Sequence, residues 1–336
     1  MIKYLGSKRA LIGWITGFVQ RIHAHAPIRT IVDLFSGSAR VGHAFKAQGY
    51  FVHANDYANY AYVLAQALVE ANRDDYPPEC IQPILQTLMH LPPTRGWFTE
   101  TYCEQARYFR PENSARIEAI REAIEAYPDP QLRAILLTSL MLAADKVDST
   151  TGLQMAYLKR WAPRAYNPLQ LEYPPLLPGA GKAHHANALE LAGALEADLF
   201  YIDPPYNQHS YLGNYHVWET LVLWDKPATY GVACKRVDVR QRKSPFNLRA
   251  QARDAMAQLI GAIQAQHLLV SFNNEGYLSR ESAGVDSARV GLCGMFRASV
   301  QTLCGRADRR SQSARREGRT GLAHTQPRDA LCSDAP

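Results

Sequence analysis

Several features common in other classes of protein are missing from this sequence. It has no run of about eighteen apolar residues, the length that a membrane-spanning helix needs. It also has no charged leader followed by an apolar stretch, which a secretion signal would need. We therefore expect neither secretion nor a membrane partner. Its six cysteines are far apart and form no C-x-x-C pair, which argues against zinc and for a reducing compartment. We therefore expect a cytoplasmic protein that holds no metal.

The 336 residues are enough for one large or two medium domains, and the hydrophobic content of 47% is ordinary for a globular protein. The formal net charge of +6 is modest. Composition therefore leaves the function open, and the local motifs have to decide it.

The most informative motif is Asp203-Pro204-Pro205-Tyr206, which closes the apolar run 198–202. Open α/β sheets build ligand sites at the carboxyl ends of their strands. The two prolines remove two backbone donors and leave carbonyls free to accept. Asp203 and the Pro204 carbonyl could both accept from an amino group, while Tyr206 offers a stacking face. The alternative is a plain strand followed by a proline turn.

A second motif spans residues 30–42, which read as a buried strand, a loop of small residues and a helix beginning near Arg40. About twenty residues later, the segment 49–56 reads as another strand that ends in Asp56. An acid at that place binds ribose hydroxyls in βαβ nucleotide folds. Residues 58–72 then read as a helix, and helices are predicted from 113 or 114 to about 126 and from 131 to about 146. Later, a helix over 250–265 precedes a strand over 267–272.

These motifs, in this order, make the chain resemble the Dam-like alpha group of DNA adenine-N6 methyltransferases over roughly residues 1–280. The resemblance implies an α/β fold, with a Rossmann-like methyltransferase sheet and an inserted, mainly helical target-recognition lobe. It implies a catalytic domain of residues 1–75 and 171–283, with a DNA-recognition insertion at 76–170. It further implies a cofactor, S-adenosylmethionine, whose product is S-adenosylhomocysteine. The implied cofactor-binding residues are Tyr4, Gly6, Lys8, Asp33, Phe35, Gly37, Asp56, Asn187 and Asp203.

Two positions depart from the family pattern. Ala39 stands where a second glycine is common, and we expect it to be tolerated if its φ is negative. Asn187 stands where an acid commonly contacts the cofactor adenine, and its amide could still bond an adenine edge.

The implied reaction is direct methyl transfer to adenine N6, without a covalent enzyme intermediate. Asp203, Pro204, Pro205 and Tyr206 are the implied catalytic residues. By accepting both amino hydrogens, Asp203 and the Pro204 carbonyl would favour the pyramidal nitrogen of the transition state. Because N6 is inaccessible inside a stacked duplex, the base has to be flipped out.

Two basic stretches are candidates for contact with double-stranded DNA. Lys159 and Arg160 follow a polar loop, and a denser cluster lies beyond the catalytic motif. Solvated surface is the alternative for both stretches. The residues predicted to bind DNA are Lys159, Arg160, Lys235, Arg236, Arg240, Arg242 and Lys243.

Residues 284–336 differ sharply from the rest, with nine arginines and no lysine, tyrosine, isoleucine or asparagine. Out-of-frame sequence would explain this bias, and a disordered basic arm is the competing hypothesis. Three other functions stay open for the whole chain: amino methylation of cytosine N4 or RNA adenine, an inactive DNA- or cofactor-binding remnant, and a dinucleotide oxidoreductase. A cognate restriction endonuclease is a possible partner.

Overall fold

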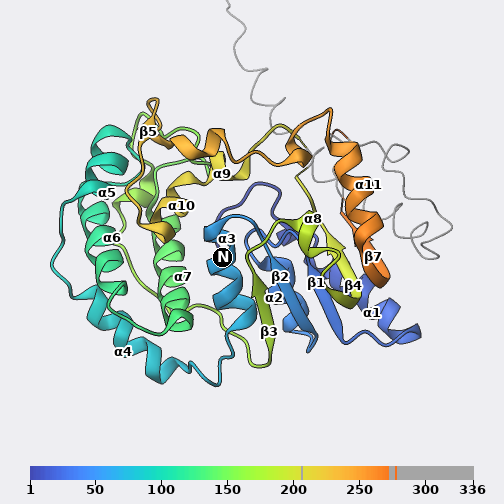
Figure 1. Ribbon diagram of the computed structural model, residues 1–336. Helices are drawn as coiled ribbons and strands as arrows, with labels where there is room; N and C mark the ends of the chain where they lie inside the picture. Colours follow the sequence, from blue (N-terminus) through green and yellow to red (C-terminus); the bar gives the residue numbers. More distant parts are fainter. Residues whose placement is uncertain (206, 272–276, 278–336) are drawn as a thin grey trace, which may run out of the picture.

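A five-stranded parallel sheet forms the centre of the molecule in a computed structural model that describes residues 1–205, 207–271 and 277 (Figure 1). The strand order is β3-β2-β1-β4-β7, and every neighbouring pair is parallel. This confirms the α/β class and agrees with a Rossmann-like sheet. The strands are β1 (Thr30–Asp33), β2 (Phe51–Asn55), β3 (Gly181–His184), β4 (Glu196–Ile202) and β7 (Gln264–Val270).

The direction of the strand order reverses between β1 and β4. From β1 the chain moves outward through β2 to β3, and it then returns to add β4 and β7 on the other side. Asp33, the last residue of β1, pairs with Tyr201 in β4. Crevices for ligands form at such a reversal, outside the carboxyl ends of the strands. The fold therefore places the loops after β1, β2 and β4 around one crevice.

Helices cover both faces of the sheet, which explains why Ile31 and Val32 of β1 and residues 199–202 of β4 are buried apolar residues. The side chains of α1 (Ile12–His25), α2 (Arg40–Lys46) and α3 (Asn59–Ala65) share one core with Ile31 and Val52. On the other face, α8 (Ala188–Leu191) and α11 (Ala252–Ala262) pack on Val32 and Phe200.

A group of helices lies beside β3 and α3 (Figure 1). Its members are α4 (Pro78–Met89), α5 (Trp97–Thr99), α6 (Pro111–Ile124), α7 (Pro130–Val147), α9 (Tyr211–Asn214) and α10 (His216–Leu223). The helices predicted from 113 or 114 and from 131 correspond to α6 and α7. Both begin with a proline, which is preorganised for a first turn, and Asp129 caps α7 by accepting from Gln131 N at 2.9 Å. These helices share the core of α1–α3, so they pack directly on the sheet half.

Shorter elements complete the described chain. The predicted helix over 58–72 is α3 followed by a π-helix, Gln66–Glu70, and a second π-helix spans Glu100–Gln105. Strands β5 (Thr229–Tyr230) and β6 (Lys235–Arg236) form an antiparallel hairpin. Single 3-10 turns occur at Lys8–Ala10, Pro163–Tyr166, Val237–Arg240 and Pro245–Asn247.

Parts of the sequence predictions lie outside the described residues. Tyr206 is one of them, and the hypotheses on the tail 284–336 are others, so they stay predictions. Within the described ranges, no helix is both long enough and apolar enough to cross a bilayer.

Candidate active site

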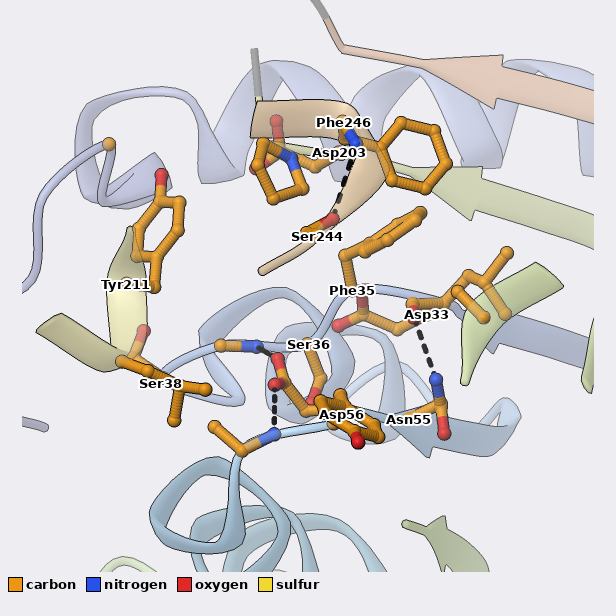
Figure 2. A pocket seen from close by; sticks show the side chains of 18 of the residues that line it. Asp33, Phe35, Ser36, Ser38, Asn55, Asp56, Asp203, Tyr211, Ser244 and Phe246 are labelled. Carbon is orange, nitrogen blue, oxygen red and sulfur yellow. Dashed lines mark hydrogen bonds between the residues drawn. The ribbon is translucent and has the colours of Figure 1, made fainter. Parts of the chain in front are cut away.

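A cavity of about 770 Å³ opens at the carboxyl edge of the sheet, where the strand order reverses (Figure 2). It draws its walls from the N-terminal segment, from the loops after β1, β2 and β4, and from a strap at residues 241–247. Sequence positions that are two hundred residues apart therefore meet in one cavity. All nine residues predicted to bind the cofactor line it: Tyr4, Gly6, Lys8, Asp33, Phe35, Gly37, Asp56, Asn187 and Asp203.

Asp33 is buried at the end of β1 and is held by the first turn of α2. Its Oδ2 accepts from Gly42 N at 2.9 Å, whereas its Oδ1 is buried and has no hydrogen-bond partner among the described residues. Burial raises the pKa of this carboxyl to about 8, against the opposing effect of the Gly42 amide; Asp203 and Asp56 raise it further. A buried acid with one unused oxygen is suited to a cationic partner.

Asp56 follows β2 and joins two loops of the cavity. Its Oδ2 accepts from Gly37 N at 2.8 Å, and its Oδ1 accepts from Ala58 N at 2.9 Å. Burial raises the pKa of this carboxyl, and the two amides oppose that shift. Next to it, Asn55 donates to the carbonyls of Leu34 and Ala186. The acid and the small-residue loop therefore form one rigid unit.

The loop between β1 and α2 uses left-handed backbone twice. Gly37 has φ +51°, and a Cβ built there would lie 2.9 Å from Cε1 of Tyr4, so only glycine fits. Ala39 has φ +57°, so the condition under which we expected alanine to be tolerated, a negative φ, is not met. The tight turn from Ser36 into α2 requires this conformation, because Ala39 N must reach the Ser36 carbonyl at 2.8 Å. Alanine therefore accepts strain at a position where relatives with glycine would have none.

Asp203, directly after β4, pairs with Lys8 across the cavity. The Nζ of Lys8 lies 2.7 Å from Oδ2 of Asp203, the Ser271 hydroxyl is a further hydrogen-bond partner of this carboxylate, and its Oδ1 is buried. Burial raises the pKa of Asp203, and the Lys8 charge opposes this shift. Pro204 is buried, and Pro205 reaches the cavity wall. The Asp203 carboxylate therefore lies in the cavity wall, where Lys8 holds it in place.

Two aromatic residues outside the predicted cofactor set, Tyr211 and Phe246, also line the cavity. Tyr4 stacks on Tyr211 and Tyr215, with ring centroids 5.3 and 4.8 Å apart. Phe246 in the strap meets Phe35 edge to face at 5.4 Å, as Figure 2 shows. The one sequence feature that could have indicated Phe246 as a cavity residue is its position directly after the basic run. Nothing local in the sequence predicts its contact with the loop after β1.

Asn187 caps the first turn of α8 and lines the cavity. Its side-chain oxygen accepts from Leu189 N at 3.1 Å, which leaves the amide Nδ2 with a long contact of 3.5 Å to Glu190. The amide can therefore still donate to a ligand.

The residues predicted to bind DNA do not lie together. Arg242 and Lys243 line the cavity, whereas Lys159 and Arg160 are exposed elsewhere. Lys235 is half-buried in β6, and Arg240 stacks over the Tyr230 ring at 3.7 Å.

Arg236 requires a correction, because only 3% of it is exposed. Its guanidinium makes two bonds to Asp225, at 2.6 and 2.7 Å, and two to Asp238, at 3.0 and 3.1 Å. A guanidinium occupied in this way anchors the hairpin and has no free face for a phosphate.

The reversed strand order, the acids at three strand ends and the glycine loop are features of α/β proteins that bind nucleoside-containing ligands. The sequence matches the family described as D12 class N6 adenine-specific DNA methyltransferase over residues 4–281. The chain therefore belongs to the D12 class of N6 adenine-specific DNA methyltransferases, as the resemblance implied. Members of this family use S-adenosylmethionine.

Individual relatives agree with this assignment. The chain is 32% identical over 296 residues to the modification methylase StsI of Streptococcus sanguinis, and the match covers 83% of this chain and 45% of that protein. It is 31% identical over 298 residues to the type II methyltransferase M.NlaIII of Neisseria lactamica, covering 83% and 85%. A similar match, 31% over 303 residues, reaches M.FokI of Planomicrobium okeanokoites, covering 83% and 46%. The chain thus spans about half of two of these relatives and most of the third.

Proposed function

We propose that this chain transfers a methyl group from S-adenosylmethionine to N6 of adenine in double-stranded DNA. The observation that carries this proposal is the convergence of Asp33, Asp56 and Asp203, from the ends of three strands, on one cavity. Family membership supports the reaction class, and the geometry supports specific roles for these residues.

The charges in the cavity suit this cofactor. The ammonium and sulfonium groups of S-adenosylmethionine are cations, and a cation beside a buried carboxyl favours its ionised form. The Asp33 carboxyl, which lines the cavity, is the proposed acceptor for the ammonium group. Asp56 lies at the position of a ribose-binding acid, and Asn187 offers its amide to an adenine edge. Bound there, the cofactor supplies an activated methyl group.

The target amino group would bind on the other side of the cavity. The Asp203 carboxylate, which lines the cavity, and the Pro204 carbonyl are the proposed acceptors for the two N6 hydrogens. Accepting both hydrogens holds the amino group so that its lone pair points at the incoming methyl. Lys8 pairs with Oδ2 of Asp203 and fixes the orientation of the carboxylate. Stacking of the flipped base on Tyr206 stays a prediction.

The helical region 76–170 is the proposed DNA-recognition part of the chain, with Lys159 and Arg160 as contacts to phosphates. Arg242 and Lys243 lie at the cavity and are proposed to contact the backbone beside the flipped base. The printed names of the relatives, type II methyltransferase and modification methylase, support a role beside a cognate restriction endonuclease.

The test is tritium transfer from labelled S-adenosylmethionine to unmethylated duplex DNA, followed by nucleoside analysis. The full chain is compared with Asp203→Ala and with the control Asp254→Ala, which removes an exposed acid from α11. We expect N6-methyladenine from the wild type and the control, with transfer about 100- to 1000-fold slower in Asp203→Ala. Cofactor binding is measured by calorimetry on the same samples.

Three outcomes would contradict the proposal. Cofactor binding without any methylated product would indicate an inactive remnant. N4-methylcytosine as product would move the chain to the alternative amino methylation. Equal rates for Asp203→Ala and Asp254→Ala would remove Asp203 from the reaction.

A further inference from the structure

The β5–β6 hairpin presents an apolar tip to solvent. Val232 at this tip is 83% exposed, the largest exposed fraction among the large hydrophobic side chains in the described part of the chain. The turn uses left-handed backbone at Gly231, φ +68°, and at Cys234, φ +45°. The hairpin projects beyond the helices that surround it (β5 in Figure 1). An apolar side chain held outward in this way has no role in the core.

The base of the hairpin is firmly anchored. Arg236 is buried and held by four bonds to two carboxylates, as described above. On the other side, the buried hydroxyl of Tyr108 lies 3.0 Å from the Ala233 carbonyl and 2.7 Å from the Gln154 carbonyl. Tyr108 therefore ties the hairpin to the loop that contains Gln154. The tip is presented by a rigid support rather than by a loose loop.

The loop that Tyr108 joins to the hairpin carries positive charge. The joined loop, residues 150–166, contains no acid, and its Lys159 and Arg160 are exposed. The Arg107 guanidinium stacks over Trp161 at 4.4 Å and donates to the Lys159 carbonyl at 2.6 Å.

The chain also leads directly from the hairpin to the cavity. Only the 3-10 turn Val237–Arg240 and Gln241 separate β6 from Arg242 in the cavity wall. These five residues limit the distance between hairpin and cavity, so a duplex whose base enters the cavity lies within reach of the hairpin.

We propose that the hairpin Thr229–Arg236 enters the DNA major groove beside the target adenine, with Val232 in contact with base edges. A two-stranded ribbon fits the major groove, and apolar contact there distinguishes the methyl group of thymine. An apolar tip gains nothing from a phosphate, so its position among basic residues indicates that it reaches past the backbone to the bases. This inference rests on the proposed DNA substrate, and it assigns base reading to a segment outside residues 76–170.

The contact is tested by placing a photoreactive benzophenone amino acid at position 232 of the full chain, with position 48 as control. Gln48 is exposed just after α2, and α2 runs back from the cavity toward the opposite edge of the sheet. The probe is a pool of random-sequence duplexes that contain adenine and thymine. We expect crosslinks from position 232 to bases and few crosslinks from position 48.

The reading role is tested by mapping methylated sites for Val232→Asp and for the control Gln48→Asp, which adds the same charge. Val232→Asp should relax or change the preferred sequence, whereas Gln48→Asp should match the wild type. On the mapped site, replacing the contacted thymine by uracil should weaken wild-type binding about fourfold, the factor for one buried methyl group. That uracil effect should vanish in Val232→Asp.

The outcomes separate this inference from the proposed function. Crosslinks at 232 without any methylation would keep the hairpin contact and reject the methylation reaction. Methylation by the wild type with no preferential crosslink at 232 would reject the hairpin and keep the reaction. Unchanged site preference in Val232→Asp, with an unchanged uracil effect, would also overturn the base-reading role.

Discussion

The predicted cofactor residues lie together in the structure, whereas the predicted DNA-binding residues of the basic segment after β4 do not. Every predicted cofactor residue lines one cavity, although these residues span positions 4–203. The five predicted DNA contacts at 235–243 are close in sequence, yet they point to different surroundings. Arg236 is buried against two acids, Arg240 stacks on Tyr230, and Arg242 reaches the cavity.

The difference has a physical cause. Residues at the ends of adjacent parallel strands have to lie at the same edge, because backbone hydrogen bonds fix the register. A run of charged residues in a turn has no such constraint, so each side chain goes to whatever partner packing supplies. Proximity along the chain is therefore weaker evidence for a shared site than position at strand ends.

The substitution with the largest expected effect on the predicted cofactor site is Gly37→Ala. The added Cβ would lie 2.9 Å from the Tyr4 ring, and the backbone has positive φ. We expect loss of measurable cofactor binding, and a free energy of unfolding lower by about 1–3 kcal/mol. Gly49→Ala is the matched control, because it has φ +87° and no neighbour within 4 Å. Calorimetry should show normal cofactor binding for Gly49→Ala; equal binding by both variants would contradict the tight fit at Gly37.

The basic segment is tested by comparing Arg236→Ala with Arg240→Ala. Arg236→Ala should lower the free energy of unfolding by about 2–3 kcal/mol, since it removes charge-assisted bonds at a buried site. Arg240→Ala should leave stability nearly unchanged and reduce the slope of log affinity against log salt by about 1. Urea unfolding and DNA-binding titrations measure the two effects. A stable Arg236→Ala with a reduced salt slope would restore Arg236 as a phosphate contact.

The pH dependence of cofactor binding probes Asp33. Because its pKa is raised from 3.8 to about 8, Asp33 carries a proton at pH 7 in the ligand-free protein. A cationic cofactor favours the ionised form, so affinity should rise with pH by up to about tenfold per unit until pH 8. Calorimetry in buffers of different ionisation enthalpy should detect proton release on binding. The free energy of unfolding should change in the opposite direction from the affinity. For the ligand-free protein it should fall as pH rises from about 4 to about 8, because only the folded state keeps this proton. Pairing with a resident cation would instead give pH-independent affinity.

Ala39→Gly should have the smallest effect. Glycine relieves left-handed strain of about 1–2 kcal/mol. The substitution also removes a buried methyl group worth about 0.8 kcal/mol. In addition, the greater conformational entropy of glycine stabilises the unfolded chain by about 0.5–1 kcal/mol. These contributions nearly cancel, so thermal unfolding should show a change within about 1 kcal/mol. A larger loss would mean that the Ala39 methyl group is essential to the packing of the loop.

Much of the fold was predictable because local patterns carry it. The apolar runs at β1 and β4 and the acids that follow them were visible in the sequence. Proline starts and periodic apolar residues likewise indicated α6 and α7. The conformation of Ala39 was not predictable, since its sign of φ depends on how tightly the loop must turn into α2.

By itself, the sequence determined which residues end the strands, and hence which acids and glycines gather at one edge of the sheet. Tertiary structure alone decided that the strap brings Phe246 onto Phe35, that Lys8 meets Asp203, and that Arg236 is buried while Val232 is exposed. Strand ends are fixed by hydrogen bonding that follows local composition. Contacts between distant segments depend on how whole elements pack, and no single stretch of sequence encodes that packing.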